Sequence, residues 1–209
     1  MNEFKEVRKN FKTLLGHPID TFDEMKFKRY YSWGFVIALM IAWIIIEILS
    51  KQYTGFRFNL SRPDELNVIV IVARTLAPFF LFAISNWCVC TLMDGEGKLC
   101  EIATYMAYAF TPYVLMRLIE LIVSNLIIIE EQVFLSWFVT FMTFYCVCLL
   151  YQALRVVHQY SFTKTLISML LTIAVLAIIL ILVLLIYSLF NQIIIFFQTV
   201  WSEIAFRYF

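Results

Sequence analysis

The chain has 209 residues, of which 63% are hydrophobic and 15% are charged, and its formal net charge is +1. A soluble globular chain is closer to half apolar and a quarter charged, and the excess here lies in runs too long for soluble core helices. The composition therefore excludes an ordinary soluble domain, and a net charge of +1 is too small to attract nucleic acid overall. It predicts an all-α, polytopic membrane protein.

Residues 1–29 are mixed and charged, unlike the short apolar stretch of a cleavable signal peptide, so we expect the first apolar run to be retained as a span. One apolar helical stripe, with basic residues over much of the remaining surface, predicts an amphipathic helix at an anionic lipid surface. The stripe consists of Phe4, Val7, Phe11, Leu14 and Leu15. Pro18 should end this helix. The stretch Thr21 to Glu24 then predicts a capping box that opens the helix leading into the first span.

Five apolar runs each have about the 20 residues that cross a bilayer core. They cover residues 31–49, 67–93, 100–124, 132–153 and 165–190. The predicted domains are a cytoplasmic amphipathic N-terminal segment (1–29), a five-span membrane domain (30–190) and an amphipathic C-terminal tail (191–209). We expect the tail to lie on the outer surface or against the bundle, because a sixth span would bury Glu203 and Arg207.

The distribution of Lys and Arg predicts the orientation. Seven of the 16 basic residues precede the first span, and Lys98, Arg155 and Lys164 fall in loops on the same side. The other side carries Lys51, Arg57, Arg62 and Arg207. By the positive-inside rule the N-terminus is cytoplasmic, and an odd number of spans places the C-terminus outside.

The polar stretch TLMDGEGKLCEIA, between the second and third spans, contains GEGK and invites comparison with a phosphate-binding loop. A P-loop also needs an earlier glycine, a hydroxyl residue after the lysine and a preceding strand, whereas Leu92 and Leu99 occupy the two positions here. The stretch instead predicts a tight cytoplasmic turn, in which Gly97 can take positive φ, docked on the basic N-terminal segment or on a cytoplasmic partner. The candidate interaction residues are Asp94, Gly95, Glu96, Gly97, Lys98 and Glu101.

Four charged residues lie inside predicted spans: Glu47, Arg74, Arg117 and Glu120. Intramembrane charges are functional candidates by default, and all four are expected in the outer half of the membrane. Arg117 and Glu120 share a helix face. One interpretation is a polar pocket between helices that opens to the outside. The other, which we favour, is mutual pairing and snorkelling that only holds the bundle together.

The remaining features favour helix packing. Alanines four residues apart, Ala73 with Ala77 and Ala103 with Ala107, permit close helix approach. The candidate kink and packing residues are Pro78, Asn86, Tyr108 and Pro112. The C-V-C pairs at 88–90 and 146–148 do not converge on a helix, and His17 and His158 fall in separate segments, so we expect no metal site. No catalytic set, cofactor motif or soluble enzyme domain is predicted.

Three stretches carry a family resemblance: GHPIDTFDEMKF, NWCVCTLMDGEGKLCEI and YMAYAFTPYVL. With five spans, they resemble the Yip family of Ypt/Rab-interacting membrane proteins over about residues 16–190, and specifically its bacterial-type branch. The resemblance implies a membrane scaffold in a bacterial cytoplasmic membrane. A Rab-type GTPase is a doubtful partner, because the N-terminal region is short and has no D-L-Y-G-P type motif. For bacterial-type relatives, association with ABC-type sugar importers is expected.

We therefore predict a non-enzymatic membrane interaction protein, an accessory subunit of a transport complex, with membrane lipids and other integral membrane proteins as partners. Two alternatives stay open. The chain could carry or conduct a small solute through the outer-half charged pocket, although five spans show no internal repeat. It could also sense or shape lipid through the basic N-terminal helix.

Overall fold

In the computed structural model, the described residues 2–54, 67–128 and 131–208 form seven α-helices and contain no strand. Two short helices come first, α1 (Asn2–Gly16) and α2 (Pro18–Phe27). The long helices follow: α3 (Trp33–Tyr53), α4 (Val68–Leu92), α5 (Leu99–Val123), α6 (Gln132–His158) and α7 (Phe162–Tyr208). All five long helices are long and apolar enough to cross a membrane. Arg57 and Arg62, which count toward the predicted orientation, lie outside the described residues.

The break between α1 and α2 falls where the sequence predicts it, with Pro18 in the first turn of α2. The predicted capping box at Thr21 to Glu24 is wrong, because these residues lie inside α2, where the Thr21 hydroxyl donates to the His17 carbonyl at 2.8 Å. The helix that leads into the membrane, α3, is capped by Ser32 instead. Its hydroxyl accepts the Phe35 N–H at 3.2 Å.

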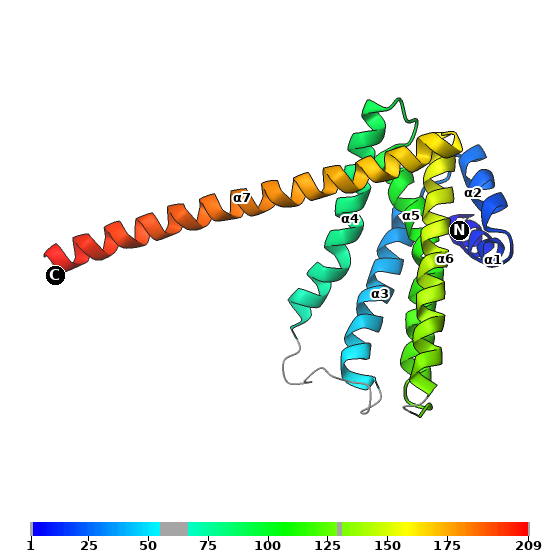
Figure 1. The fold of residues 1–209 in the computed structure, drawn as a ribbon, viewed down its shortest axis with the longest axis horizontal. Coiled ribbons are helices and arrows are strands. Elements are labelled where there is room, and N and C mark those ends of the chain that lie inside the picture. The colour runs from blue at the N-terminus through cyan, green and yellow to red at the C-terminus, as the bar shows by residue number, and fades with distance from the viewer. Residues whose placement is uncertain (1, 55–66, 129–130, 209) are drawn as a thin grey trace.

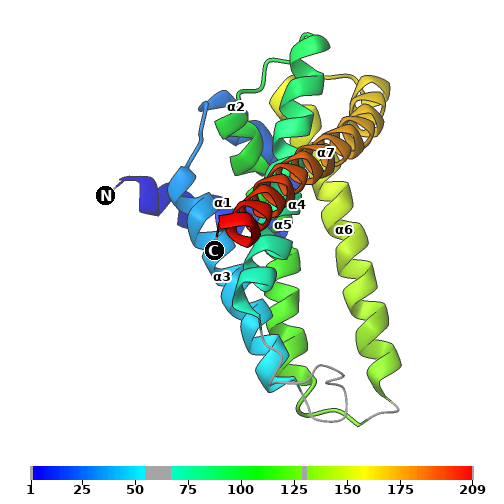
Figure 2. The same ribbon diagram turned by 90° about the vertical axis from the view of Figure 1, so that its left-hand side faces the viewer.

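Helix α5 is the centre of the bundle and packs against α3, α4 and α6 (Figures 1 and 2). Its alanines Ala103, Ala107 and Ala109 are fully buried, which allows the neighbouring helices to approach closely. The register between α3 and α5 is fixed at both ends. The Ser32 N–H donates to the Thr104 hydroxyl at 3.2 Å, and the Asn125 amide donates to the Tyr53 carbonyl at 2.9 Å.

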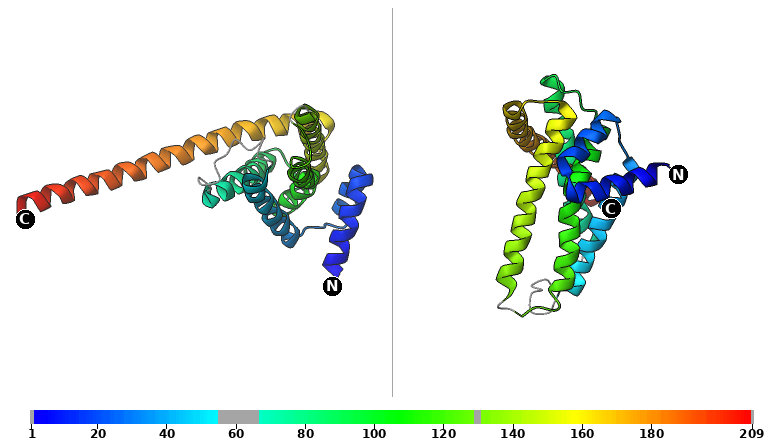
Figure 3. Two further views of the ribbon diagram at one scale, coloured as in Figure 1. Left: turned by 90° about the horizontal axis from the view of Figure 1, so that it is seen from below. Right: turned by 90° about the vertical axis from the view of Figure 1, so that its right-hand side faces the viewer.

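This register places the first turn of α5 beyond the start of α3. Helix α2 covers that extension: Phe22 is fully buried and stacks on Tyr105, with ring centroids 6.0 Å apart. Helix α1 packs on α2 and α5, and Leu14 is buried in the same core. We call this end of the bundle, where α4 and α6 end and α5 begins, the α2 end. The opposite end, where α3 and α5 end and α6 begins, is the distal end (Figure 3).

Helix α7 leaves the bundle. It is one continuous helix of 47 residues, with no break near residue 190, so the predicted tail extends the last span without interruption. Only its first part lies beside α4 and α6, and the remainder projects away from the other helices (Figures 1 and 3). Its buried residues are the small hydroxyl residues Thr165, Ser168 and Thr172, and none of residues 173–207 is buried.

Candidate functional site

Three of the four predicted intramembrane charges meet near the distal end. Arg117 on α5 donates through Nε to Glu47 Oε1 at 3.1 Å and through Nη2 to Glu47 Oε2 at 3.3 Å, which is a bidentate pair across two helices. Its Nη1 donates to Glu120 Oε2, one turn further along α5. The indole N–H of Trp43 adds a donor to Glu47 Oε1 at 3.3 Å. We call Glu47, Arg117 and Glu120 the charged triad.

The triad is mostly enclosed, since its side chains are only 21–29% exposed. One guanidinium faces two carboxylates, so with all three groups ionised the triad carries a net charge of −1. Arg74 does not join it: this residue is exposed on α4 and forms no ion pair within the part of the chain that the structure describes. The predicted group of four is therefore a group of three.

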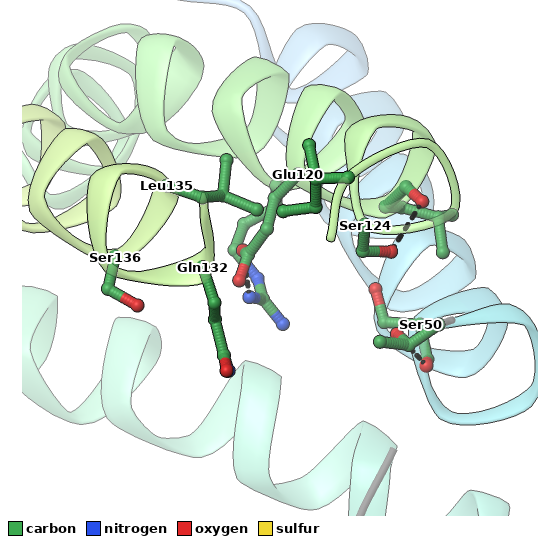
Figure 4. A pocket seen from close by; sticks show the side chains of 10 residues that line it. Ser50, Glu120, Ser124, Gln132, Leu135 and Ser136 are labelled. Carbon is green, nitrogen blue, oxygen red and sulfur yellow. Dashed lines mark hydrogen bonds and ion pairs between the residues drawn. The ribbon is translucent and has the colours of Figure 1, made fainter. Parts of the chain in front are cut away.

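A pocket of about 120 Å³ opens beside the triad. Figure 4 shows Glu120 from α5 and Gln132 from α6 pointing into the same space, with Ser50 of α3 on the opposite wall. Ser124 and Ser136 add hydroxyl groups, and Leu135 is one of the apolar lining residues. The two interpretations of these charges thus both find support in the geometry: the charges pair, and they also line a polar cavity between α3, α5 and α6.

A second polar cluster, which the sequence did not predict, joins α4, α6 and α7 at the α2 end. His158 is the last residue of α6 and is buried, not part of a separate loop as expected. Its Nε2 lies 3.0 Å from Asn86 Oδ1, and the Asn86 amide donates to the Thr172 hydroxyl at 3.1 Å. All three side chains are at most 2% exposed. We call them the buried network.

The polar turn between α4 and α5 closes over this network. A Cβ on Gly95 would lie 2.6 Å from His158 Nδ1 and 2.6 Å from the Tyr160 hydroxyl, and one on Gly97 would lie 2.8 Å from His158 Cε1. Gly97 does not take the positive φ that the sequence suggested, and Asp94 adopts it instead, at 56°. The glycines are needed for close approach and not for backbone conformation.

Tyr160 and Lys164 complete the lid over the buried network. The Tyr160 hydroxyl donates to the Met93 carbonyl at 3.1 Å, and its ring stacks on His158 with centroids 5.3 Å apart. Burial raises the pKa of Tyr160, which keeps the hydroxyl protonated as a donor. The Lys164 ammonium lies 4.4 Å from the centre of the Tyr160 ring, within cation–π range.

The turn also contacts the N-terminal segment, as the sequence predicted it could. Lys26 of α2 donates to the Val157 carbonyl at 2.7 Å, and its ammonium lies 3.8 Å from the Glu96 carboxylate. At the other end of the turn, Glu101 Oε2 accepts the Lys98 backbone N–H at 3.3 Å and so caps α5. The candidate turn residues are thus held by the protein's own helices, and a role in binding a partner remains a prediction.

The candidate packing residues divide between buried and exposed positions. Asn86, Tyr108 and Pro112 are buried, and Tyr108 stacks on Phe35 with centroids 4.1 Å apart. Pro78 is exposed on α4, as are Ala73 and Ala77, so the predicted small-residue contact exists on α5 but not there. The five cysteines are free thiols, and the described residues contain no group of three metal-ligating side chains.

Taken together, a helical bundle of five apolar helices, charged groups paired inside it and two helices packed over one end define a polytopic integral membrane protein. The family model of the Yip1 domain matches residues 12–203, which is almost the whole chain. The chain therefore belongs to the Yip1 domain family, as the resemblance indicated. No curated protein and no solved structure matches it.

Proposed function

We propose that this chain is a non-enzymatic interaction protein of a bacterial cytoplasmic membrane, an accessory subunit of a transport complex such as an ABC-type sugar importer. In this proposal the α2 end faces the cytoplasm and the C-terminus lies outside, which the excess of Lys and Arg before α3 supports. The helix α7 is the docking element, and its partner is another polytopic protein of the same membrane.

The observation that carries the proposal is the exposure of α7. Its 47 residues correspond to about 70 Å at 1.5 Å per residue, whereas a bilayer core is about 30 Å thick. None of residues 173–207 is buried, although this part of the helix carries many large apolar side chains; Phe196 and Trp201, for example, are 64% and 73% exposed.

A partner protein explains this arrangement better than lipid alone does. A span that is much longer than the bilayer core must tilt strongly or distort the bilayer, at a cost that rises with the mismatch. Residues 173–186 of α7 are all apolar, so this part of the helix also lacks the polar face of a helix lying at the lipid surface. Packing against the helices of another membrane protein accommodates both the length of α7 and the all-round apolar surface of residues 173–186.

The proposal can be tested by site-specific photo-crosslinking in the native membrane. A photoreactive residue replaces Phe196 or Trp201 on α7 in the full-length chain, and crosslinked products are identified by mass spectrometry. We expect the same polytopic protein from both α7 positions. The matched control carries the photoreactive residue at Phe141, which is equally exposed, 64%, but lies on α6.

Equal crosslinking yields to that protein from α7 and from Phe141 would show that the contact is not specific to α7. Crosslinking of α7 to lipid alone would favour the lipid-shaping alternative, and crosslinking to a second copy of this chain would indicate a homo-oligomer. Either of these results contradicts the accessory-subunit proposal.

A further inference from the structure

The pocket at the distal end has a chemical character that a purely structural ion pair does not need. Its volume of about 120 Å³ far exceeds the roughly 10–15 Å³ required for a single water molecule. If the triad only held the helices together, a bundle in which this space was closed would be more stable, because unfilled volume between helices costs packing contacts. The pocket instead remains between three helices, with polar groups on each wall.

The charge of the pocket selects against anions. Arg117 is the cationic lining residue, and its guanidinium already faces both carboxylates of the triad. Glu47 receives two N–H bonds from Arg117 and one from Trp43, whereas Glu120 receives one N–H bond on Oε2 only. The excess negative charge therefore resides on Glu120, the carboxylate that lines the pocket.

The other polar groups of the pocket can accept hydrogen bonds. Ser50, Gln132 and Ser136 line it, and the hydrogen bonds of the described residues do not occupy the polar atoms of their side chains. Each of these residues presents an oxygen that can accept an N–H, and Glu120 presents its second carboxylate oxygen. A ligand with one positive charge and several N–H donors matches this set.

We propose that the distal pocket binds a small primary ammonium group, with Glu120 as the counter-charge and Ser50, Gln132 and Ser136 as hydrogen-bond acceptors. An –NH₃⁺ group carries three N–H donors on a compact positive charge, whereas a fully methylated ammonium keeps the charge but has no N–H donor. The group can belong to a free small amine or to the ethanolamine headgroup of a lipid, because the apolar helices α3 and α5 end and α6 begins beside the pocket, and ends of spans are expected at the headgroup level. The inference concerns a ligand and does not depend on the accessory-subunit role.

The test measures binding of ethanolamine to the full-length protein in phosphatidylcholine nanodiscs at neutral pH by isothermal titration calorimetry. Wild-type protein should bind ethanolamine saturably. Glu120→Gln preserves the size of the side chain and an acceptor for Arg117 but removes the charge, and it should weaken binding about ten- to a hundredfold. Glu203→Gln, the same substitution on an exposed part of α7, should leave binding unchanged.

Choline and glycerol serve as matched ligands, the first without N–H donors on its nitrogen and the second without a charge. Both should bind at least tenfold more weakly than ethanolamine. Ser136→Ala, on the pocket rim, gives a second variant that keeps the triad intact, and a few-fold loss of affinity is expected. Unchanged affinity in both Glu120→Gln and Ser136→Ala, equal binding of choline, or equal competition by potassium ions would each overturn the proposal.

Repeating the titration in nanodiscs that contain phosphatidylethanolamine distinguishes the two sources of the ammonium group. A weaker apparent affinity for free ethanolamine, relative to phosphatidylcholine nanodiscs, identifies the lipid headgroup as a competitor in the pocket. An unchanged affinity assigns the pocket to a free amine. Both results support recognition of a primary ammonium group, and they differ only in where that group comes from.

Discussion

The two ends of the bundle use polar groups in opposite ways. At the α2 end, His158, Asn86 and Thr172 form a nearly inaccessible network, and the turn packs so closely over it that two positions require glycine. At the distal end, Glu47, Arg117 and Glu120 carry full charges and stand beside a pocket. Neutral groups in tight contact fix helices in place, whereas charged groups beside a pocket remain available to bind a ligand. The contrast separates a structural end from a candidate ligand-binding end.

The largest expected effect comes from removing the cation of the distal triad. Arg117→Met leaves two carboxylates without their shared partner in a mostly enclosed site, and we expect a loss of about 3 kcal/mol of stability. Thermal unfolding in detergent measures it. Adding Glu47→Gln and Glu120→Gln should restore most of the loss, because no charge is then left uncompensated. If Arg117→Met alone were as stable as the wild type, water would already solvate the two carboxylates.

At the α2 end, Asn86→Ala should cost about 2 kcal/mol, because it removes the partner of both the His158 ring and the Thr172 hydroxyl in a site without water access. The same thermal measurement applies, and limited proteolysis near residue 160 should increase as α7 loosens. Gln52→Ala is the control, since Gln52 is exposed near the end of α3 and lies at the other end of the bundle from the network. If both variants lose the same stability, the network has no special role.

The glycine requirement gives a smaller effect. Gly97→Ala should lose about 1–2 kcal/mol, because the added Cβ would overlap Val157 and His158. Gly34→Ala on α3 meets nothing closer than 3.7 Å and removes a helical glycine, so it should be neutral or stabilising by up to about 1 kcal/mol. A melting temperature that rises for both variants would show that the turn can move away from His158.

The smallest effect concerns exposed charges at the α2 end. Hydrogen bonds from Lys9 and then Lys28 hold the pKa of Glu24 below its usual value. A lowered acid pKa stabilises the folded state above the unfolded pKa, and this contribution is lost as the pH falls through the folded pKa, below about 4.5. The protection factors of the α1 amides, which compare exchange with the intrinsic rate at each pH, should fall slightly over that range. Glu24→Gln should remove this pH dependence. If the pH dependence persists in the variant, it arises from another titratable group.

The sequence predicted the elements governed by local rules and apolar length. All five long helices, the break at Pro18 and the approach of charged residues from α3 and α5 follow from hydropathy, proline geometry and helical spacing. Depth along a helix can be counted from sequence, and it places Arg74 at the level of the triad, whereas the direction in which α4 faces depends on packing. His158 was missed for the same reason: a single histidine near a predicted loop carries no signal until the turn and α7 close around it.

The hydroxyl stripe of Thr165, Ser168 and Thr172 was a detectable signal. These residues are spaced three and four apart and so share a helix face, and small hydroxyl side chains, like alanines, favour helix contacts in membranes. The pocket is harder to predict from the sequence. Its lining comes from three helices, so its existence depends on the register of α3 against α5 and on where α6 begins.

Helix α7 also acts mechanically as a lever. Its attachment to the bundle ends near Thr172, about 15 Å from the start of the helix, and about 54 Å of helix extends beyond that point. Pivoting there, a displacement of about 5 Å at the free end corresponds to only about 1.4 Å at the start of α7, beside Tyr160. A large movement of a protein bound to the free end of α7 would therefore displace the start of α7 by only about one to two ångströms. A shift of that size at the start of α7 is large enough to disturb the contacts of Tyr160 with the Met93 carbonyl and the His158 ring.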